Sequence, residues 1–350
     1  MASLRQQIGQ MLMMGFDGMD IQDNSPVKHW LSGDGLGGVL LFDFDVAENR
    51  PGKNISSQQQ VAQLNQKLKA LCADDDELPL FIAIDYEGGA VDRLKHVAGC
   101  PKTLTPAQLA RLSDRELSAQ CESMANTLRS LGFNLNFAPT LDLNLNSEAG
   151  IIGKLQRSFS DQPADVARVA DRFVQIFADH GITCCYKHFP GHGSATGDTH
   201  EGFVDVSDTF QRQELEPYAS LIGNTQYPAM IMTAHVINKQ LDPSGLPATL
   251  SPAILNTLLR EKMGYDGVII SDDLQMNAIS KHFSLEDSLR MTINAGADMV
   301  IIANQLGNVS ATEVIDLIEN LVNNKAIPLA RITQAWQRIV RLKQMLKVCA

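Results

Sequence analysis

The segment from Lys187 to Phe203, KHFPGHGSATGDTHEGF, concentrates residues that can do chemistry: three histidines, a lysine, an aspartate and four glycines. It follows the apolar run GITCCY, so these polar side chains come at the end of a predicted strand. Two kinds of site fit the segment. One is a cradle for a metal ion, and the other is a mobile loop that carries a proton-transfer residue.

In the metal hypothesis the ligands are histidines, which are the commonest metal ligands in proteins. The candidates are His188, His192, His200 and His235. The sequence lacks the usual spacings of such sites, since it contains neither H-E-x-x-H nor H-x-H after an early strand. The proton-transfer hypothesis is therefore favoured, and no metal is expected.

In the proton-transfer hypothesis the reacting group is His200, which lies two residues after Asp198. Side chains at i and i+2 of an extended loop can share a face. Asp198 can then accept a hydrogen bond from one imidazole nitrogen and leave the other for acid–base catalysis. The four glycines of the segment predict a loop that moves to close over a substrate.

Titratable side chains also follow other predicted strands. They are Asp85, Glu87 and Arg93 after LFIAI, His235 after AMIMT, and Asp272 and Asp273 after GVIIS. Asp273 is better placed to cap the helix expected after its strand, which leaves Asp272 to face a cavity. A carboxylate held in that way can attack an electrophilic carbon and form a covalent intermediate.

The elements that must position these residues form a regular alternation. Helical patterns, several opening with Ser or Asp and closing with Gly, separate eight short apolar runs. The runs are 11–16, 38–42, 80–84, 133–138, 182–186, 229–233, 267–271 and 299–303, and the last helix is expected at about 330–346. Eight such units predict one α/β domain over residues 1–350, a (β/α)₈ TIM barrel with its chemistry at the carboxyl ends of the strands. A doubly wound open sheet is the rival, but no G-x-G-x-x-G follows the first run.

Composition narrows the function classes. The chain has 350 residues, is 44% hydrophobic and carries a net charge of −11, without a Lys/Arg cluster. Nucleic acid and membrane are therefore not expected as partners. The N-terminal segment has no signal-like apolar region, and the six cysteines form no CxxC pair, which predicts a cytoplasmic protein with free buried thiols. We expect a monomer.

Five stretches together resemble family 3 of the glycoside hydrolases, and within it the one-domain bacterial β-N-acetylglucosaminidases (β-N-acetylhexosaminidases) of peptidoglycan recycling. They are IAIDYEGGAVDRL, QRSFS, YKHFPGHGSATGDTHEGF, LPATLSPAILNTLLREKMGYDGVIISDDLQM and AGADMVII, in the family's order along nearly the whole chain. The resemblance implies a (β/α)₈ barrel and a retaining mechanism without a cofactor. It also implies a small carbohydrate substrate, a muropeptide or chito-oligosaccharide that contains N-acetylglucosamine (GlcNAc).

The resemblance also implies roles for individual residues. The family's nucleophile falls on Asp272, and its acid/base falls on His200, tuned by Asp198. The positions that hold the sugar fall on Asp85, Arg93, Arg157, Lys187 and His188. The segment 43–60 is longer and more acidic than in the simplest members, and we expect it to line the leaving-group side of the pocket.

Other functions stay open from the sequence. A β-glucosidase or broad exo-glycosidase of the same family is the nearest alternative, and transfer to phosphate is a variant of it. A metal-dependent barrel hydrolase is more distant. A sugar-binding barrel without catalysis is disfavoured, because each expected catalytic position is filled.

Overall fold

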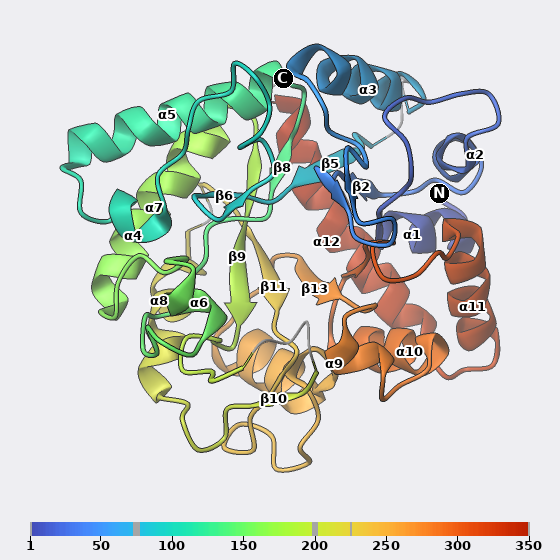
Figure 1. Ribbon diagram of the computed structural model, residues 1–350. Helices are drawn as coiled ribbons and strands as arrows, with labels where there is room; N and C mark the ends of the chain where they lie inside the picture. The colour runs from blue at the N-terminus through green and yellow to red at the C-terminus, as the bar shows by residue number, and fades with distance from the viewer. Residues whose placement is uncertain (1, 73–77, 198–201, 225, 349–350) are drawn as a thin grey trace.

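The strands of the computed structural model, which describes residues 2–72, 78–197, 202–224 and 226–348, close into a parallel barrel (Figure 1). Going round the barrel, the strands follow the order of the chain. They are β1 Leu12–Met14, β2 Gly38–Leu40, β5 Phe81–Ile84, β8 Leu135–Asn136, β9 Thr183–Phe189, β11 Met230–Thr233, β13 Ile269–Asp273 and β14 Met299–Ile302. The predicted (β/α)₈ barrel is confirmed. The open sheet is wrong, because β1 pairs with β14 and closes the ring.

Each of the eight predicted apolar runs overlaps one barrel strand. Nearly all of their side chains are buried, as expected for strands covered on both faces. Two strands extend beyond the predicted runs, β9 as far as Phe189 and β13 as far as Asp273. Lys187, His188 and Asp272 therefore lie on strands, where backbone hydrogen bonds hold them more firmly than a loop would.

Helices surround the barrel (Figure 1). They are α1 Leu4–Gln10, α2 Pro26–Ser32, α3 Gln58–Ala70, α4 Pro106–Leu109, α5 Asp114–Ser130, α6 Ile151–Lys154, α7 Pro163–Asp179, α8 Glu216–Leu221, α9 Asn277–Ser280, α10 Leu285–Ala295, α11 Ala311–Asn323 and α12 Leu329–Val348, with 3₁₀ turns η1 Arg212–Leu215 and η2 Ala248–Leu250 and a π-helix η3 Ala253–Lys262. The predicted start signals work as caps: Ser57, Ser113 and Ser310 each accept a hydrogen bond from a backbone N–H in the first turn.

Helix α12 contacts the amino-terminal end of the barrel. The buried ammonium of Lys343 donates to Gln10 Oε1 at 2.7 Å and to the Gly37 carbonyl at 2.6 Å, just before β1 and β2. Arg331 and Arg338 pair with the buried Asp298, which directly precedes β14. This end of the barrel is thus held by structural contacts, which leaves the opposite end for a site.

Three pairs of short strands lie among the connections that leave the carboxyl ends of the barrel strands. β3 Phe44–Asp45 pairs antiparallel with β4 Arg50–Pro51, and β6 Tyr86–Gly88 with β7 Val91–Asp92. β10 Val204–Asp205 pairs in parallel with β12 Val236–Ile237. These pairs give order to connections that carry candidate site residues.

Two further sequence predictions concern the cysteine thiols and the absence of a membrane-spanning helix. Cys121, Cys184 and Cys185 are buried free thiols, as predicted, whereas Cys72 and Cys100 are only half-buried. Burial raises the pKa of Cys121 to about 12. None of the helices in the described ranges is both long and apolar enough to cross a bilayer.

Candidate functional site

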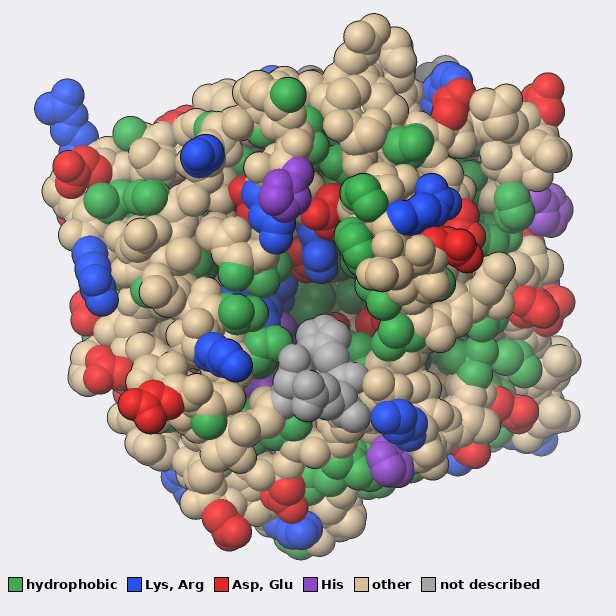
Figure 2. Space-filling view, viewed as in Figure 1, with side chains coloured by type: hydrophobic (Ala, Val, Ile, Leu, Met, Phe, Trp, Pro, Cys, Tyr) green, Lys and Arg blue, Asp and Glu red, His purple; other side chains and the backbone are tan. Residues whose placement is uncertain are grey.

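A cavity of about 460 Å³ lies at the carboxyl ends of the barrel strands. Figure 2 shows a hollow near the centre of this face, with hydrophobic side chains gathered around it. Six of the eight residues expected to act in catalysis or sugar binding line the cavity: Asp85, Arg93, Arg157, Lys187, His188 and Asp272. The other two, Asp198 and His200, lie outside the described residues.

A buried network of charges forms part of the cavity wall. The Arg157 guanidinium makes two hydrogen bonds to the Glu87 carboxylate, at 2.9 and 2.7 Å. The Lys187 ammonium lies 2.7 Å from Glu87 Oε1 and 3.3 Å from Asp85 Oδ1. All of these groups are mostly shielded from solvent, and the Glu87 side chain is fully buried. The network therefore holds two cations in fixed positions at the cavity.

Burial and charge compete in setting the protonation of this network. Burial alone would raise the pKa of Glu87, but the charges of Arg157 and Lys187 outweigh it and hold that pKa below its usual range. Burial likewise opposes the charge on Lys187, yet Glu87 and Asp85 raise the pKa of its ammonium. The carboxylates are ionised and the ammonium is protonated at neutral pH, so Asp85 can accept strongly from a sugar hydroxyl, and the two cations can donate to a hydroxyl or carbonyl oxygen.

Arg93 extends the network toward the β3–β4 connection. Its guanidinium donates to Asp85 Oδ2 at 3.1 Å, lies 3.6 Å from Asp43 Oδ1 and sits over the Phe42 ring. Burial would raise the pKa of Asp85, but Lys187 and Arg93 hold it below its usual range. Asp85 thus accepts from two cationic side chains, which fixes its carboxylate against the cavity.

His188 is oriented by Asp142, a residue that the sequence reasoning missed. The His188 Nδ1 lies 2.7 Å from Asp142 Oδ2, and Asp142 also accepts from the backbone N–H of His192 at 2.8 Å. Burial opposes the charge of Asp142, but the nearby His188 holds its pKa below the usual range. An ionised carboxylate beside Nδ1 makes that nitrogen the donor and sets the tautomer of the ring.

Glu87 was noted among the titratable side chains that follow predicted strands, without a role, whereas Asp142 was overlooked. Glu87 follows the third apolar run by three residues, and Asp142 follows the fourth by four. Both are buried at the carboxyl ends of β5 and β8. Their importance comes from the partners that the barrel brings to them, which are distant in the chain.

Asp272 and Asp273 end β13, and both line the cavity. Asp272 Oδ1 accepts the backbone N–H of Asp273 at 2.8 Å, which restricts rotation of the carboxylate. Asp273 was expected to cap the next helix, but the N-cap residue of α9 is Met276. Asp273 Oδ1 instead accepts from the backbone of Gln275 and of Ala303, so it ties the loop after β13 to the end of β14.

The segment that precedes residues 198–201 is closely packed. Glu214 Oε2 accepts from the backbone N–H groups of Gly193, at 3.0 Å, and of Ser194. A Cβ at Gly193 would lie 2.0 Å from the Leu143 carbonyl oxygen, and Gly191 has a φ of 139°. Close packing requires glycine at position 193, and the backbone conformation favours glycine at position 191. The sequence had instead been interpreted as placing these glycines in a mobile loop.

Two of the histidines proposed as metal ligands, His188 and His235, have other contacts. Nδ1 of His188 is held by Asp142, and His235 bonds Thr249 and the Asp273 carbonyl. Burial lowers the pKa of His192 to about 4, so its ring is neutral at neutral pH. Within the part of the chain that the structure describes, no three His, Cys, Asp or Glu side chains form a group that could hold a metal ion.

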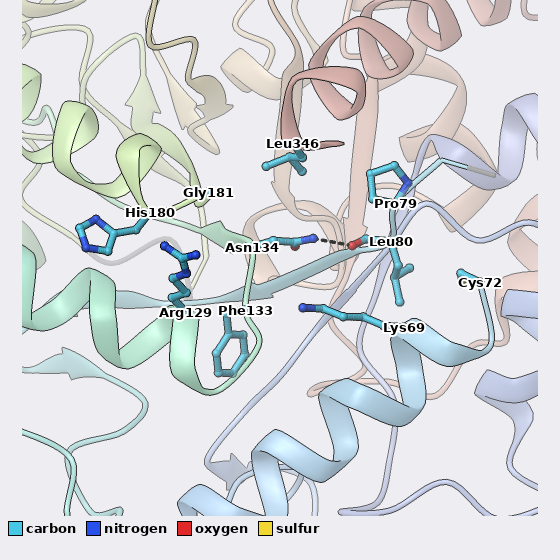
Figure 3. A pocket seen from close by; sticks show the side chains of 10 residues that line it. All are labelled: Lys69, Cys72, Pro79, Leu80, Arg129, Phe133, Asn134, His180, Gly181 and Leu346. Atoms are coloured by element: carbon cyan, nitrogen blue, oxygen red, sulfur yellow. Dashed lines mark hydrogen bonds between the residues drawn. The ribbon is translucent and has the colours of Figure 1, made fainter. Parts of the chain in front are cut away.

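A second cavity, of about 420 Å³, lies at the opposite end of the barrel. Figure 3 shows Lys69, Arg129 and His180 around it, with the Asn134 amide donating to the Leu80 carbonyl. Among the described residues that line it there is no carboxylate side chain. Its place at the amino-terminal ends of the strands, where barrels carry stabilising residues, also speaks against a catalytic site.

Comparison with known proteins agrees with the fold. Residues 3–342 match the glycosyl hydrolase family 3 N-terminal domain. The chain belongs to glycosyl hydrolase family 3. It is therefore a glycoside hydrolase, and the cavity at the carboxyl ends of its strands is the candidate active site.

Family 3 relatives of known name support the same assignment. The chain is 32% identical over 333 residues to β-hexosaminidase A of Pseudoalteromonas piscicida, covering 89% of this chain and 54% of that protein. A solved family 3 β-N-acetylglucosaminidase from a Paenibacillus species superposes with a TM-score of 0.86 at 34% identity, over 100% of this chain and 64% of that one. The β-N-acetylhexosaminidase of Beutenbergia cavernae gives a TM-score of 0.85 at 26% identity, over 98% and 99%. The chain thus spans about half of the first protein and nearly all of the last.

Proposed function

We propose that this family 3 chain is a retaining β-N-acetylglucosaminidase that removes a terminal β-linked GlcNAc through a covalent intermediate on Asp272. The observation that carries the proposal is geometric. A carboxylate at the tip of a barrel strand lines the same cavity as a fixed set of buried charged hydrogen-bonding groups. The choice of GlcNAc as the sugar is supported by the relatives named as β-hexosaminidases and β-N-acetylglucosaminidases.

In the first step an Asp272 oxygen bonds the anomeric carbon while the bond from that carbon to the leaving oxygen breaks. The leaving oxygen takes a proton from an acid, for which we propose His200 oriented by Asp198. An imidazole suits this role because its unperturbed pKa of about 6.5 lies near working pH. A positioned acid of this kind contributes on the order of 10²–10⁴-fold to the rate.

In the second step water attacks the anomeric carbon and gives its proton to the same imidazole, and the bond to Asp272 breaks. Two displacements at one carbon return the β-configuration, which makes the enzyme retaining. The hydrogen bond from the Asp273 N–H to Asp272 Oδ1 stabilises the carboxylate both as nucleophile and as leaving group.

The buried network holds the sugar during both steps. We propose that Asp85 accepts from sugar hydroxyls, while Arg157 and Lys187 donate to hydroxyl or acetamido oxygens and His188 adds a further polar contact. Because these side chains are already fixed by one another, little conformational entropy is lost when the sugar binds. We propose cell-wall muropeptides or chito-oligosaccharides as the source of the GlcNAc.

The test is kinetic. 4-Nitrophenyl β-N-acetylglucosaminide and the matching β-glucoside are compared, and the configuration of the first product is read by NMR. We expect kcat/KM to favour the acetamido sugar by about a hundredfold or more, since a site built for a polar group rejects a substrate that lacks it. The first product should be the β-anomer. Equal rates on the two glycosides would identify a broad exo-glycosidase, and an α-anomer would exclude the covalent intermediate.

Two further readouts separate the remaining alternatives. Activity that survives exhaustive chelation excludes a metal-dependent hydrolase. Product analysis in phosphate buffer distinguishes hydrolysis, which yields free GlcNAc, from transfer to phosphate, which yields the sugar 1-phosphate.

A further inference from the structure

Large apolar side chains are exposed at the candidate active site. Phe44 is 38% exposed, Val46 49%, Leu155 37% and Leu306 50%, and all four line the cavity. In the described part of the chain, they make up half of the eight large apolar side chains that are exposed. Exposed large apolar side chains are therefore concentrated at this cavity.

The hairpin that carries two of these residues has an inverted pattern. Side chains alternate along a strand, so Phe44 and Asp45 of β3 face opposite sides of the hairpin, and Val46 follows in the turn between β3 and β4. In most half-buried hairpins the apolar face is buried and the polar face is exposed. Here Asp45 is buried, with Oδ1 accepting from the Glu48 backbone, while the apolar pair faces open space.

The loop after β14 holds the inverted hairpin in place. The Gln305 amide accepts from the Val46 backbone N–H and donates to the Phe44 carbonyl, both at 3.0 Å. Lys53 is buried, with 3% of the residue exposed. Its ammonium donates to the Asn304 carbonyl at 2.5 Å and lies 3.0 Å from Asp17 Oδ1. The loop after β14, which also carries Leu306, thus fixes the hairpin, so the apolar surface is preorganised.

Polarity changes along the cavity. Lys187 and Arg157 are 3% and 8% exposed, whereas the apolar side chains named above are 37–50% exposed. The charged network therefore forms the floor and the apolar residues form the mouth. An exo-acting glycosidase holds the terminal sugar on the floor and points its leaving group toward solvent, so the leaving group passes the mouth.

We propose that Phe44, Val46 and Leu306 form a leaving-group subsite for a neutral group with an apolar face, such as an aryl ring or the C–H face of a second sugar ring. This inference rests on the function proposed above, because it needs a glycoside whose terminal sugar is on the floor. The subsite acts on substrate choice, since it contacts the part of the glycoside that departs in the first step.

The experiment uses the Phe44→Ser/Val46→Ser double variant, and Leu306→Ser as an independent variant on a different loop. Leu329→Ser is the control, since Leu329 is an apolar residue of α12 that is 56% exposed and does not line the cavity. We measure kcat/KM for 4-nitrophenyl β-N-acetylglucosaminide and for chitobiose, and the inhibition constant of free GlcNAc. Free GlcNAc can occupy the terminal-sugar position at the floor of the cavity, but it has no leaving group.

We expect kcat/KM to fall about tenfold in the subsite variants while inhibition by GlcNAc stays within about twofold, because only the leaving group loses contacts. A fall for the aryl glycoside alone identifies an aromatic leaving group, and a fall for both substrates identifies any apolar face. Unchanged kcat/KM, or a parallel loss of GlcNAc inhibition, overturns the subsite. A wild-type protein that cleaves no β-N-acetylglucosaminide overturns the proposed function itself.

Discussion

Replacing Glu87 with glutamine tests the buried charge network at the floor of the cavity. Within the described residues, Glu87 is the carboxylate that pairs with Arg157, through two hydrogen bonds, and it also contacts Lys187 at 2.7 Å. Glutamine has nearly the same shape but no charge, and its amide nitrogen is a donor that would face a donor of the guanidinium. The substitution therefore leaves Arg157 buried without its counter-charge.

The magnitude follows from the degree of burial. Removing one partner of a buried ion pair costs about 3–5 kcal/mol. Lys187 keeps Asp85 at 3.3 Å, and the new amide oxygen can still accept one hydrogen bond, so we expect the lower end of that range, about 3 kcal/mol. This is a large part of the roughly 5–15 kcal/mol by which a domain is stable.

The assay is urea unfolding near pH 7, with Glu122→Gln as the matched control. Glu122 also pairs with a basic side chain, His180 at 3.1 Å, but is 49% exposed, so its loss should cost less than about 1 kcal/mol. Because Arg157 and Lys187 hold the pKa of Glu87 below its usual range, its stabilising effect is present above about pH 4.5 and is lost as the pH falls below that value. The difference from the wild type should narrow in acid. A loss no larger than the control, or one that is constant with pH, would refute the reasoning.

Three other substitutions test separate parts of the structure. Asp142→Asn removes the charge that orients a cavity histidine, and we expect kcat/KM of the folded variant to fall about ten- to a hundredfold; an unchanged rate contradicts this role. Burial lowers the pKa of Lys343 from 10.5 to about 7, so the folded state holds fewer protons between those values and gains stability as the pH rises. Lys343→Met should lose this gain, about 1.4 kcal/mol per pH unit between about pH 7.5 and 9, and parallel pH–stability curves for the two proteins would count against it. Gly193→Ala would place a Cβ 2.0 Å from the Leu143 carbonyl and should lower the melting temperature, whereas Gly202→Ala, where a Cβ meets nothing within 4 Å, should not; equal effects would contradict the packing account.

The sequence predicted the barrel because its signals are local. Each barrel strand coincides with a short run of apolar residues that is buried on both faces, and such a run can be recognised from neighbouring residues alone. The same property placed Asp85, Lys187, His188 and Asp272 correctly at one end of the barrel, since parallel strands share their carboxyl ends. The strand ends were less predictable: β9 and β13 run two or three residues further than their apolar runs, because backbone pairing continues after hydrophobicity stops.

Partners distant in the chain could not be predicted. Glu87 and Arg157 are seventy residues apart, and His188 and Asp142 forty-six, so only the closed barrel shows that they meet. The inverted hairpin at Phe44 also escaped prediction in detail, because an apolar residue in a strand normally indicates burial. Asp198 and His200 lie outside the described residues, so their role as acid/base stays a prediction.

The central claim is that Asp272 forms the bond to the sugar, and trapping tests it most directly. The wild-type enzyme is incubated with 5-fluoro-β-N-acetylglucosaminyl fluoride, which forms the intermediate faster than water can release it, and the digested protein is mapped by mass spectrometry. Our account predicts a single sugar label, attached to the side chain of Asp272, and no label on Asp273. A label on Asp273 or on any other residue would contradict it.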